Sequence, residues 1–151
     1  MDYKWGPIYW IFLHNFCDKI DENYFINNKP LVLDTIKLIS TSLPCEICSE
    51  HAKTALAKYN YYNISNKEDL KKFIFDFHNH VNHKLKKHIH DISILNTYNN
   101  CNFNVSYNNY IKITNKYTNN NVIIPKLMLH NFHNKNSFNI IKTNIKKIFY
   151  N

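Results

Sequence analysis

The sequence predicts an all-α protein in which four amphipathic helices form a compact bundle. Helix breakers are scarce, since the 151 residues include one glycine, Gly6, and four prolines. This scarcity favours long helices with short connections between residues 8 and 90. Apolar residues also recur at helical spacing in four successive stretches, and a four-helix bundle buries such stripes in one core. A chain of this length can form a single domain with a substantial core.

The first two helices are each predicted to begin near a proline, a residue that suits the first position of a helix. The first runs from about Pro7 to Lys19 and presents one face composed of Trp10, Leu13, His14 and Cys17. The second begins near Pro30 and carries a stripe composed of Val32, Ile36, Ile39 and Leu43.

The next two helices are predicted on either side of residue 60. The third begins at Pro44 and Cys45 and continues through Cys48, Ala52, Ala55, Leu56 and Tyr59. The fourth begins at a capping box, in which Glu68 follows Ser65 by three residues. Its apolar seam is composed of Leu70, Phe73, Phe77, Val81 and Leu85.

The character of the sequence changes after Leu95. Residues 98–121 are rich in Asn and Tyr with β-branched patches, and we expect an irregular hairpin or a loop there. Residues 136–150 predict a final helix with lysines outward and an inward stripe of Phe138, Ile141, Ile145, Ile148 and Phe149. We therefore divide the chain into a helical domain, residues 1–98, and an Asn-, Lys- and Tyr-rich C-terminal appendage of uncertain structure and unknown role, residues 99–151.

The basic composition favours some partners over others. The net charge is +8, and all 19 basic residues are lysines. Because base-edge and bidentate phosphate recognition favour arginine, nucleic acid is not the expected partner, although lysines attract phosphates non-specifically. No apolar run approaches the length of a membrane span, and the N-terminus lacks the apolar run of a secretory signal. We expect a cytosolic protein, in which four cysteines favour redox or metal chemistry over structural disulfides.

The segment from Cys45 to Cys48 places two thiols three residues apart. At a helix N-terminus these positions lie about 5–6 Å apart on one face, within reach of a disulfide. The free amides and the helix dipole there favour the thiolate, particularly that of Cys45, which suits thiol–disulfide exchange. Zinc is the alternative, with Cys45, Cys48, His51 and a further histidine as ligands. However, the sequence has no second Cys-x-x-Cys or closely spaced His pair to complete the usual set of zinc ligands.

Polar side chains continue the apolar seam of the fourth helix. His78 and Asn82 lie in line with Val81 and Leu85, and burying such groups unpaired costs about 1–3 kcal/mol each. A planar cofactor rich in heteroatoms would explain them. The alternatives are that these side chains pair with one another or that the helix end is exposed. Two histidines on other faces of this helix are expected to be solvated, His80 and His83.

Three motifs together resemble the Erv/ALR family of FAD-linked sulfhydryl oxidases. They are WGPIYWIFLH at residues 5–14, LPCEIC at residues 43–48, and FHNHVNHKL at residues 77–85 with Lys87. They cover about residues 5–95 and resemble in particular the short members carried by large cytoplasmic DNA viruses, African swine fever virus among them. The resemblance implies a four-helix bundle with a short fifth helix around the isoalloxazine ring of FAD, usually as a homodimer.

The resemblance also implies roles for individual residues. Cys48 would be the cysteine beside the flavin, and Cys45 the one that meets the substrate. No metal is implied. Pro7 stands where the family often has a basic residue. The implied FAD site is composed of Gly6, Pro7, Trp10, His14, Cys48, His78, Asn79, Val81, Asn82, Leu85 and Lys87.

The implied reaction is 2 R-SH + O2 → R-S-S-R + H2O2, with FAD carrying the electrons. Its substrates would be thiol-containing proteins, such as virion proteins or a thioredoxin-like carrier, in the host cytoplasm at viral assembly sites or in the virion. Of the remaining cysteines, Cys17 is expected to be a buried thiol. Cys101 is a buried thiol, a partner of Cys17 or an electron relay. The alternative functions are a zinc-binding Cys/His module and a Lys-rich nucleic-acid-binding protein.

Overall fold

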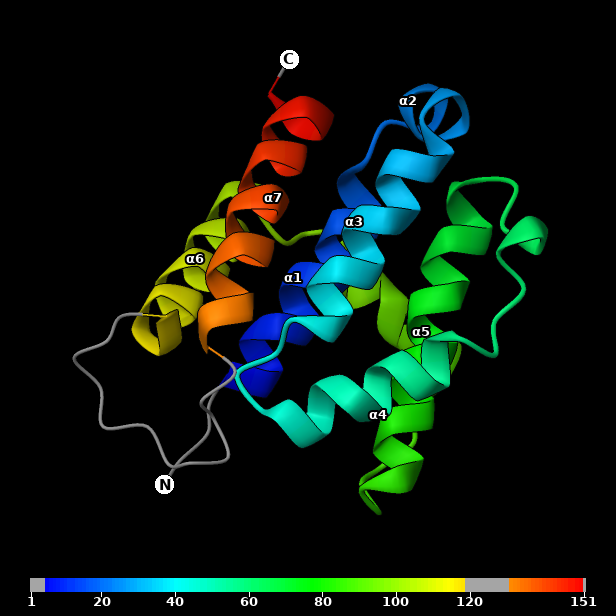
Figure 1. Ribbon diagram of the computed structural model, residues 1–151. Coiled ribbons are helices and arrows are strands. Elements are labelled where there is room, and N and C mark those ends of the chain that lie inside the picture. Colours follow the sequence, from blue (N-terminus) through cyan, green and yellow to red (C-terminus); the bar gives the residue numbers. More distant parts are fainter. Residues whose placement is uncertain (1–4, 119–130, 151) are drawn as a thin grey trace. The chain divides into compact units, whose positions relative to one another are not determined.

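The computed structural model describes residues 5–118 and 131–150, and it is built from helices, which confirms the predicted all-α class. The contacts divide the described residues into two units, one within residues 1–26 and 60–110 and the other within residues 27–59 and 111–151. The elements are α1 (Trp5–Lys19), α2 (Glu22–Asn27), α3 (Lys29–Thr41), α4 (Glu46–Leu56), η1 (Tyr61–Asn63), α5 (Lys67–Lys84), η2 (Ile92–Tyr98), α6 (Phe103–Thr118) and α7 (Asn131–Phe149). Figure 1 labels the seven α-helices among them.

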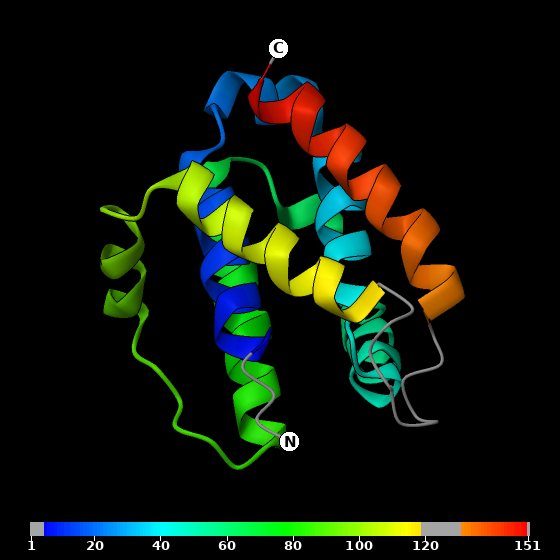
Figure 2. The ribbon, with the colours of Figure 1, turned by 90° about the vertical axis from the view of Figure 1, so that its left-hand side faces the viewer.

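In the first unit α1 packs against α5, and the 3-10 helix η2 contacts both. Figure 2 shows the chain leaving α5 and returning as η2 beside α1. The predicted inward faces are confirmed at Leu13, His14 and Cys17 of α1 and at Leu70, Phe73 and Phe77 of α5, whereas Trp10 and Val81 are only half-buried. The fully or almost fully buried side chains of this core include Phe12, Leu13, Phe16, Cys17, Leu70, Phe73, Ile74 and Phe77.

The N-terminus of α5 lies one residue later than the predicted capping box. Asn66 is the N-cap, and its side-chain oxygen accepts a hydrogen bond from the Asp69 amide at 2.8 Å. The Asp69 carboxylate in turn accepts one from the Ser65 amide at 2.9 Å. The predicted pairing of Ser65 with Glu68 is therefore wrong. Asn is among the strongest N-cap residues, and Asp69 lies at the position from which a carboxylate can reach back.

A reversal of the backbone ends α5 at Lys84. The Lys87 amide donates to the Asn82 carbonyl at 2.8 Å, and the Lys86 amide donates to the His83 carbonyl at 3.1 Å. These two bonds define a Schellman motif, which requires a left-handed residue and usually uses glycine. Here that residue is Lys86, with a φ of 54°. Leu85 was predicted to continue the buried seam, but at the helix end it is 56% exposed.

The expectation of a hairpin or loop over residues 98–121 is wrong. Tyr98 ends η2, and α6 occupies residues 103–118, while residues 119–121 lie outside the described part of the chain. Three aromatic residues at helical spacing gather on one side of α6 against Phe12, whose ring stacks on that of Tyr110 at 4.3 Å. Burial of this aromatic face outweighs the modest helix propensity of asparagine. The face is composed of Phe103, Tyr107 and Tyr110.

In the second unit α3 packs against both α4 and α7 (Figure 1). The apolar stripe predicted for α3 is confirmed by the burial of Val32, Ile36 and Ile39. The final helix is also confirmed, although α7 begins five residues earlier than predicted and Phe149 is only half-buried. The buried side chains of α7 between residues 136 and 149 are Phe138, Ile141, Ile145 and Ile148.

The domain boundary at residue 98 stays a prediction. Residues beyond it nevertheless contribute to the helical core, because α6 packs aromatic rings on Phe12 of α1. The Asn144 side chain of α7 similarly donates to the Thr35 hydroxyl of α3 at 3.0 Å. None of the described helices is both long enough and apolar enough to cross a bilayer.

Candidate functional site

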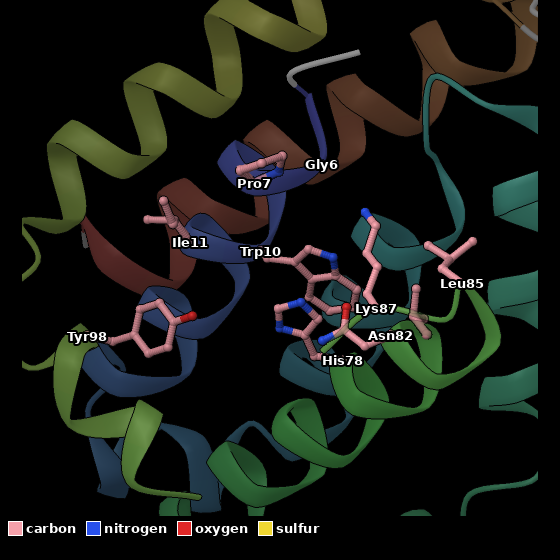
Figure 3. Close-up of a pocket in the computed structure, with 10 residues that line it drawn as sticks. Gly6, Pro7, Trp10, Ile11, His78, Asn82, Leu85, Lys87 and Tyr98 are labelled. Carbon is pink, nitrogen blue, oxygen red and sulfur yellow. The ribbon is translucent and has the colours of Figure 1, made fainter. Parts of the chain in front are cut away.

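A cavity of about 280 Å³ lies in the first unit, between α1, the C-terminal half of α5 and η2. Eight of the residues assigned to the cofactor site by resemblance line it, together with two that were not predicted. The lining consists of Gly6, Pro7, Trp10, Ile11, His78, Val81, Asn82, Leu85, Lys87 and Tyr98. In Figure 3 Trp10 and His78 lie at the centre, with Tyr98 on one side and Leu85 and Lys87 on the other.

Three rings, those of Trp10, His78 and Tyr98, form one wall of this cavity, and the ring of His14 joins two of them. The rings of Trp10 and His78 are stacked, with centroids 3.9 Å apart and planes 8° from parallel. His78 Nδ1 lies 3.0 Å from Nε2 of His14, so the two imidazoles share a hydrogen bond. His14 stacks on Tyr98, with centroids 4.5 Å apart. His14 therefore supports the wall from behind, although it does not line the cavity.

Both imidazoles of the wall are neutral at neutral pH. Burial, assisted by the charges of His78 and His90, lowers the pKa of His14 from 6.5 to about 3. Burial, assisted by the charges of His90 and Lys87, lowers the pKa of His78 to about 4. A neutral imidazole has one donor and one acceptor nitrogen, so the shared hydrogen bond requires one ring to donate and the other to accept.

Two asparagines of α5 differ in what their side chains contact. The Asn79 amide donates to the His90 carbonyl at 2.9 Å and accepts from the His90 amide at 3.0 Å. Asn79 thus holds the segment that follows α5 and does not line the cavity. The Asn82 side chain does line it and is 6% exposed. Within residues 5–118 and 131–150, that side chain forms no hydrogen bond, and its amide is not among the fully buried unpaired polar groups, so the amide is open to a ligand in the cavity.

Mutual pairing and exposure, the two alternatives to a ligand on the polar face of α5, each apply to part of that face. His78 pairs with another side chain, that of His14. His80 and His83 are exposed, as predicted. Asn82 follows neither alternative, because it is buried within the cavity wall.

Gly6 and Lys87 also line the cavity. A Cβ atom at Gly6 would meet no atom within 4 Å, so the glycine leaves space beside the start of α1. Lys87 is exposed and brings an ammonium group to the same cavity. The Schellman motif at Lys86 turns the chain so that Lys87 reaches the cavity rather than continuing the helix.

The Cys-x-x-Cys pair belongs to the second unit, at the start of α4. Cys45 and Cys48 form a disulfide, with their Cα atoms 5.2 Å apart. Cys45 is the N-cap of α4, and its sulfur accepts a hydrogen bond from the Cys48 amide at 3.3 Å. The prediction that the pair lies at a helix N-terminus within disulfide reach is confirmed, although Tyr59 falls beyond the end of that helix.

The other cysteines are free thiols, so they are not partners of each other. Cys17 is fully buried, as expected, and burial raises its pKa well above the ordinary value for a thiol. Cys101 is partly exposed and donates weakly to the Thr97 carbonyl at 3.7 Å. In the described part of the chain, no group of three His, Cys, Asp or Glu side chains could hold a metal ion.

Sequence reasoning missed Ile11 and Tyr98 as lining residues. Ile11 is an exposed aliphatic residue of α1 that faces the cavity edge. Tyr98 lies fourteen positions after the end of α5, on a 3-10 helix that no helical periodicity predicted. Only the chain path after α5 brings it to His14.

Comparison with known proteins identifies the family of this chain. The model of the Erv1/Alr family matches residues 7–108. A protein of African swine fever virus from a Malawi isolate, named an FAD-linked sulfhydryl oxidase, is 34% identical over 102 residues, which is 62% of this chain and 85% of its own. A Namibian isolate carries a protein of the same name that is 36% identical over 85 residues, 56% of this chain and 71% of its own.

A relative from Invertebrate iridescent virus 6 is 31% identical over 93 residues, 55% of this chain and 80% of its own. No solved structure matches the chain. The family match covers more than half of the sequence and contains both the Cys45–Cys48 pair and most of the residues that line the cavity. This chain belongs to the Erv1/Alr family.

Proposed function

We propose that this protein is an FAD-dependent thiol oxidase that forms disulfide bonds in protein substrates. The observation that carries the proposal is the Cys45–Cys48 disulfide at the N-terminus of α4, with a backbone amide directed at the Cys45 sulfur. Family membership and the names of the viral relatives support the same activity.

The cavity of the first unit fits part of an FAD molecule. Its volume of about 280 Å³ is near the lower end of small-molecule pockets, about 300–1,000 Å³, which suits one ring system of a larger cofactor. The stacked Trp10 and His78 rings offer aromatic surface, and Asn82 offers an amide that faces the cavity and has no hydrogen-bond partner among the described residues. Lys87 offers a cation for a phosphate group. Gly6, Val81 and Leu85 would complete the contacts.

The assignment of cofactor-binding residues remains a proposal. Gly6, Pro7, Trp10, His78, Val81, Asn82, Leu85 and Lys87 line the cavity, and we assign them to direct contact with FAD. His14 and Asn79 would act behind this surface, through His78 and through the backbone of His90. We keep Cys48, which belongs to the second unit, as the cysteine that faces the flavin.

Thiol–disulfide exchange at Cys45 begins the proposed reaction. A substrate thiolate attacks the Cys45 sulfur, the Cys45–Cys48 bond breaks, and Cys48 leaves as a thiolate. A second substrate thiolate then attacks the substrate sulfur of the mixed disulfide, which releases Cys45 and leaves the substrate oxidised. Two electrons now reside on the reduced Cys45–Cys48 pair. When bound, FAD supplies the acceptor for these electrons.

We further propose oxygen as the final acceptor, with hydrogen peroxide as the product. The substrates would be cytoplasmic thiol proteins of a viral assembly site, such as virion proteins or a thioredoxin-like carrier, and the enzyme would act as a homodimer. This placement rests on the viral origin of the relatives.

Oxygen consumption with a dithiol substrate tests the proposed function. The wild-type protein is expected to turn over, whereas Cys45→Ser and Cys48→Ser are each expected to lose turnover while retaining FAD. Cys101→Ser is the matched control, because Cys101 is a free thiol outside the pair, and it should retain turnover with a small dithiol. Wild-type rates from Cys48→Ser would refute the role of the pair.

A further inference from the structure

A buried hydroxyl fastens the segment that leads into the Cys45–Cys48 pair. Ser49 is fully buried, and its Oγ accepts a hydrogen bond from the Leu43 amide at 3.0 Å. The same hydroxyl lies 3.4 Å from the Leu43 carbonyl, to which it can donate. Ser49 thus bonds to both peptide groups of one residue across Pro44.

We call the two hydrogen bonds between Ser49 and Leu43 the clasp, and they close a short loop around Cys45. The Ser49 amide donates to the Cys45 carbonyl at 2.9 Å, and the Cys48 amide donates to the Cys45 sulfur at 3.3 Å. Cys45 itself has an extended backbone, with φ of −115° and ψ of 112°, so the segment before the helix must be held for the cysteine to remain its N-cap. The hydroxyl of Ser49 holds this segment through its two hydrogen bonds to Leu43.

We infer that Ser49 is a positioning residue that sets the oxidising power of the Cys45–Cys48 pair. The inference rests on the proposed function. A thiolate accepts a stronger hydrogen bond than a disulfide sulfur, because it is charged. The clasp holds Cys45 where its sulfur accepts the hydrogen bond from the Cys48 amide. It therefore stabilises the reduced pair, with Cys45 as a thiolate, more than it stabilises the disulfide. A dithiol stabilised in its reduced form is a stronger oxidant.

Two serine-to-alanine variants distinguish this role from a general effect of packing. Ser49→Ala removes the clasp, while Ser40→Ala removes the same atom from another fully buried serine of the second unit. The Ser40 hydroxyl has no hydrogen-bond partner among the described residues. The backbone-bonding role of Ser49 predicts partial rescue by Ser49→Thr, which keeps the hydroxyl.

The measurement is the anaerobic equilibrium of the full-length, FAD-loaded protein with glutathione redox buffers, read by trapping free thiols. Ser49→Ala is expected to shift the equilibrium toward the disulfide by roughly fivefold, the size of one neutral hydrogen bond. That factor equals about 20 mV for a two-electron couple, in which tenfold is about 30 mV. The turnover of the Ser49→Ala variant at pH 7 should fall, and it should recover at higher pH as the thiolate fraction of Cys45 is restored. Ser40→Ala should match wild type in both respects.

Equal potentials and pH profiles for wild type and Ser49→Ala would overturn the inference. An equal shift in Ser40→Ala would overturn it too, because packing rather than the clasp would then be responsible. Failure of the proposed function gives a different result, in which the wild-type pair does not exchange with glutathione or the wild-type protein consumes no oxygen with a dithiol.

Discussion

The imidazoles of His14 and His78 share a hydrogen bond, Nε2 to Nδ1 at 3.0 Å, that joins α1 to α5 beside the cavity. Burial lowers the pKa of His14 to about 3 and that of His78 to about 4 in the folded protein, from 6.5. Below about pH 6.5 the unfolded chain binds more protons than the folded one, so protonation favours unfolding. The stabilisation is complete above about pH 6.5 and is lost as the pH falls toward 3.

We therefore predict that the free energy of unfolding decreases steadily between pH 7 and pH 4. Urea titrations across this range measure the slope. His78→Gln should give a shallower slope because it removes one of the two groups, while His80→Gln, at an exposed position, should keep the wild-type slope. An unchanged slope in His78→Gln would show that other groups determine the acid sensitivity.

Asn82 is expected to serve the ligand rather than the fold. Asn82→Leu should weaken FAD binding by roughly tenfold, the effect of about 1.4 kcal/mol. It should leave the unfolding temperature of the FAD-free protein unchanged or higher, because the lost amide has no partner among the described residues. Asn79→Leu is the contrast. It removes two hydrogen bonds to His90 and should lower that temperature. Flavin titration and thermal unfolding of both variants separate ligand binding by Asn82 from support of the fold by Asn79. A destabilised Asn82→Leu protein would contradict the role that we assign to Asn82.

Lys86 occupies a left-handed position, with a φ of 54°, that glycine adopts at lower cost. Lys86→Gly should stabilise the protein by about 0.5–1 kcal/mol. Lys84→Gly, two residues earlier at the last residue of α5, should destabilise it by up to about 1 kcal/mol. Chemical denaturation of the two variants provides the test. Destabilisation by Lys86→Gly would mean that the Schellman motif does not form in solution.

The helix α7 is expected to be an integral part of the second unit. Ile145 is fully buried, whereas Ile140 on the same helix is 45% exposed. Ile145→Ala should cost about 2–5 kcal/mol of unfolding free energy, while Ile140→Ala should cost under about 0.5 kcal/mol. Denaturant titration measures both. Equal, small effects would mean that α7 does not pack on α3.

Much of the fold was predictable because helical periodicity reports burial directly. Residues such as Leu13, Ile36 and Ile145 were predicted to face inward on α1, α3 and α7, and all three are fully buried. The helix α6 was not predicted, because its Asn-rich, β-branched composition disfavours a helix locally. Contacts with a distant helix stabilise it, namely the packing of its rings on Phe12 and the hydrogen bond from Asn15 to Ser106. Such contacts cannot be deduced from local propensity.

The candidate site shows the same contrast between local and distant information. Trp10, His78 and Asn82 emerged from motif and spacing, and all three line the cavity. Tyr98 did not, because its place against His14 depends on the path of the chain after the left-handed Lys86. The position of the N-cap at Asn66 rather than Ser65 likewise depended on a choice between neighbouring residues that can both cap a helix.

Anaerobic reduction of the bound flavin tests the central claim most directly. The purified full-length protein, loaded with FAD, should show the visible absorption of a bound flavin, and a dithiol added without oxygen should bleach it. Cys48→Ser should carry the same colour and resist bleaching. A protein that stays colourless after incubation with FAD, or a Cys48→Ser variant that bleaches at the wild-type rate, would contradict the account.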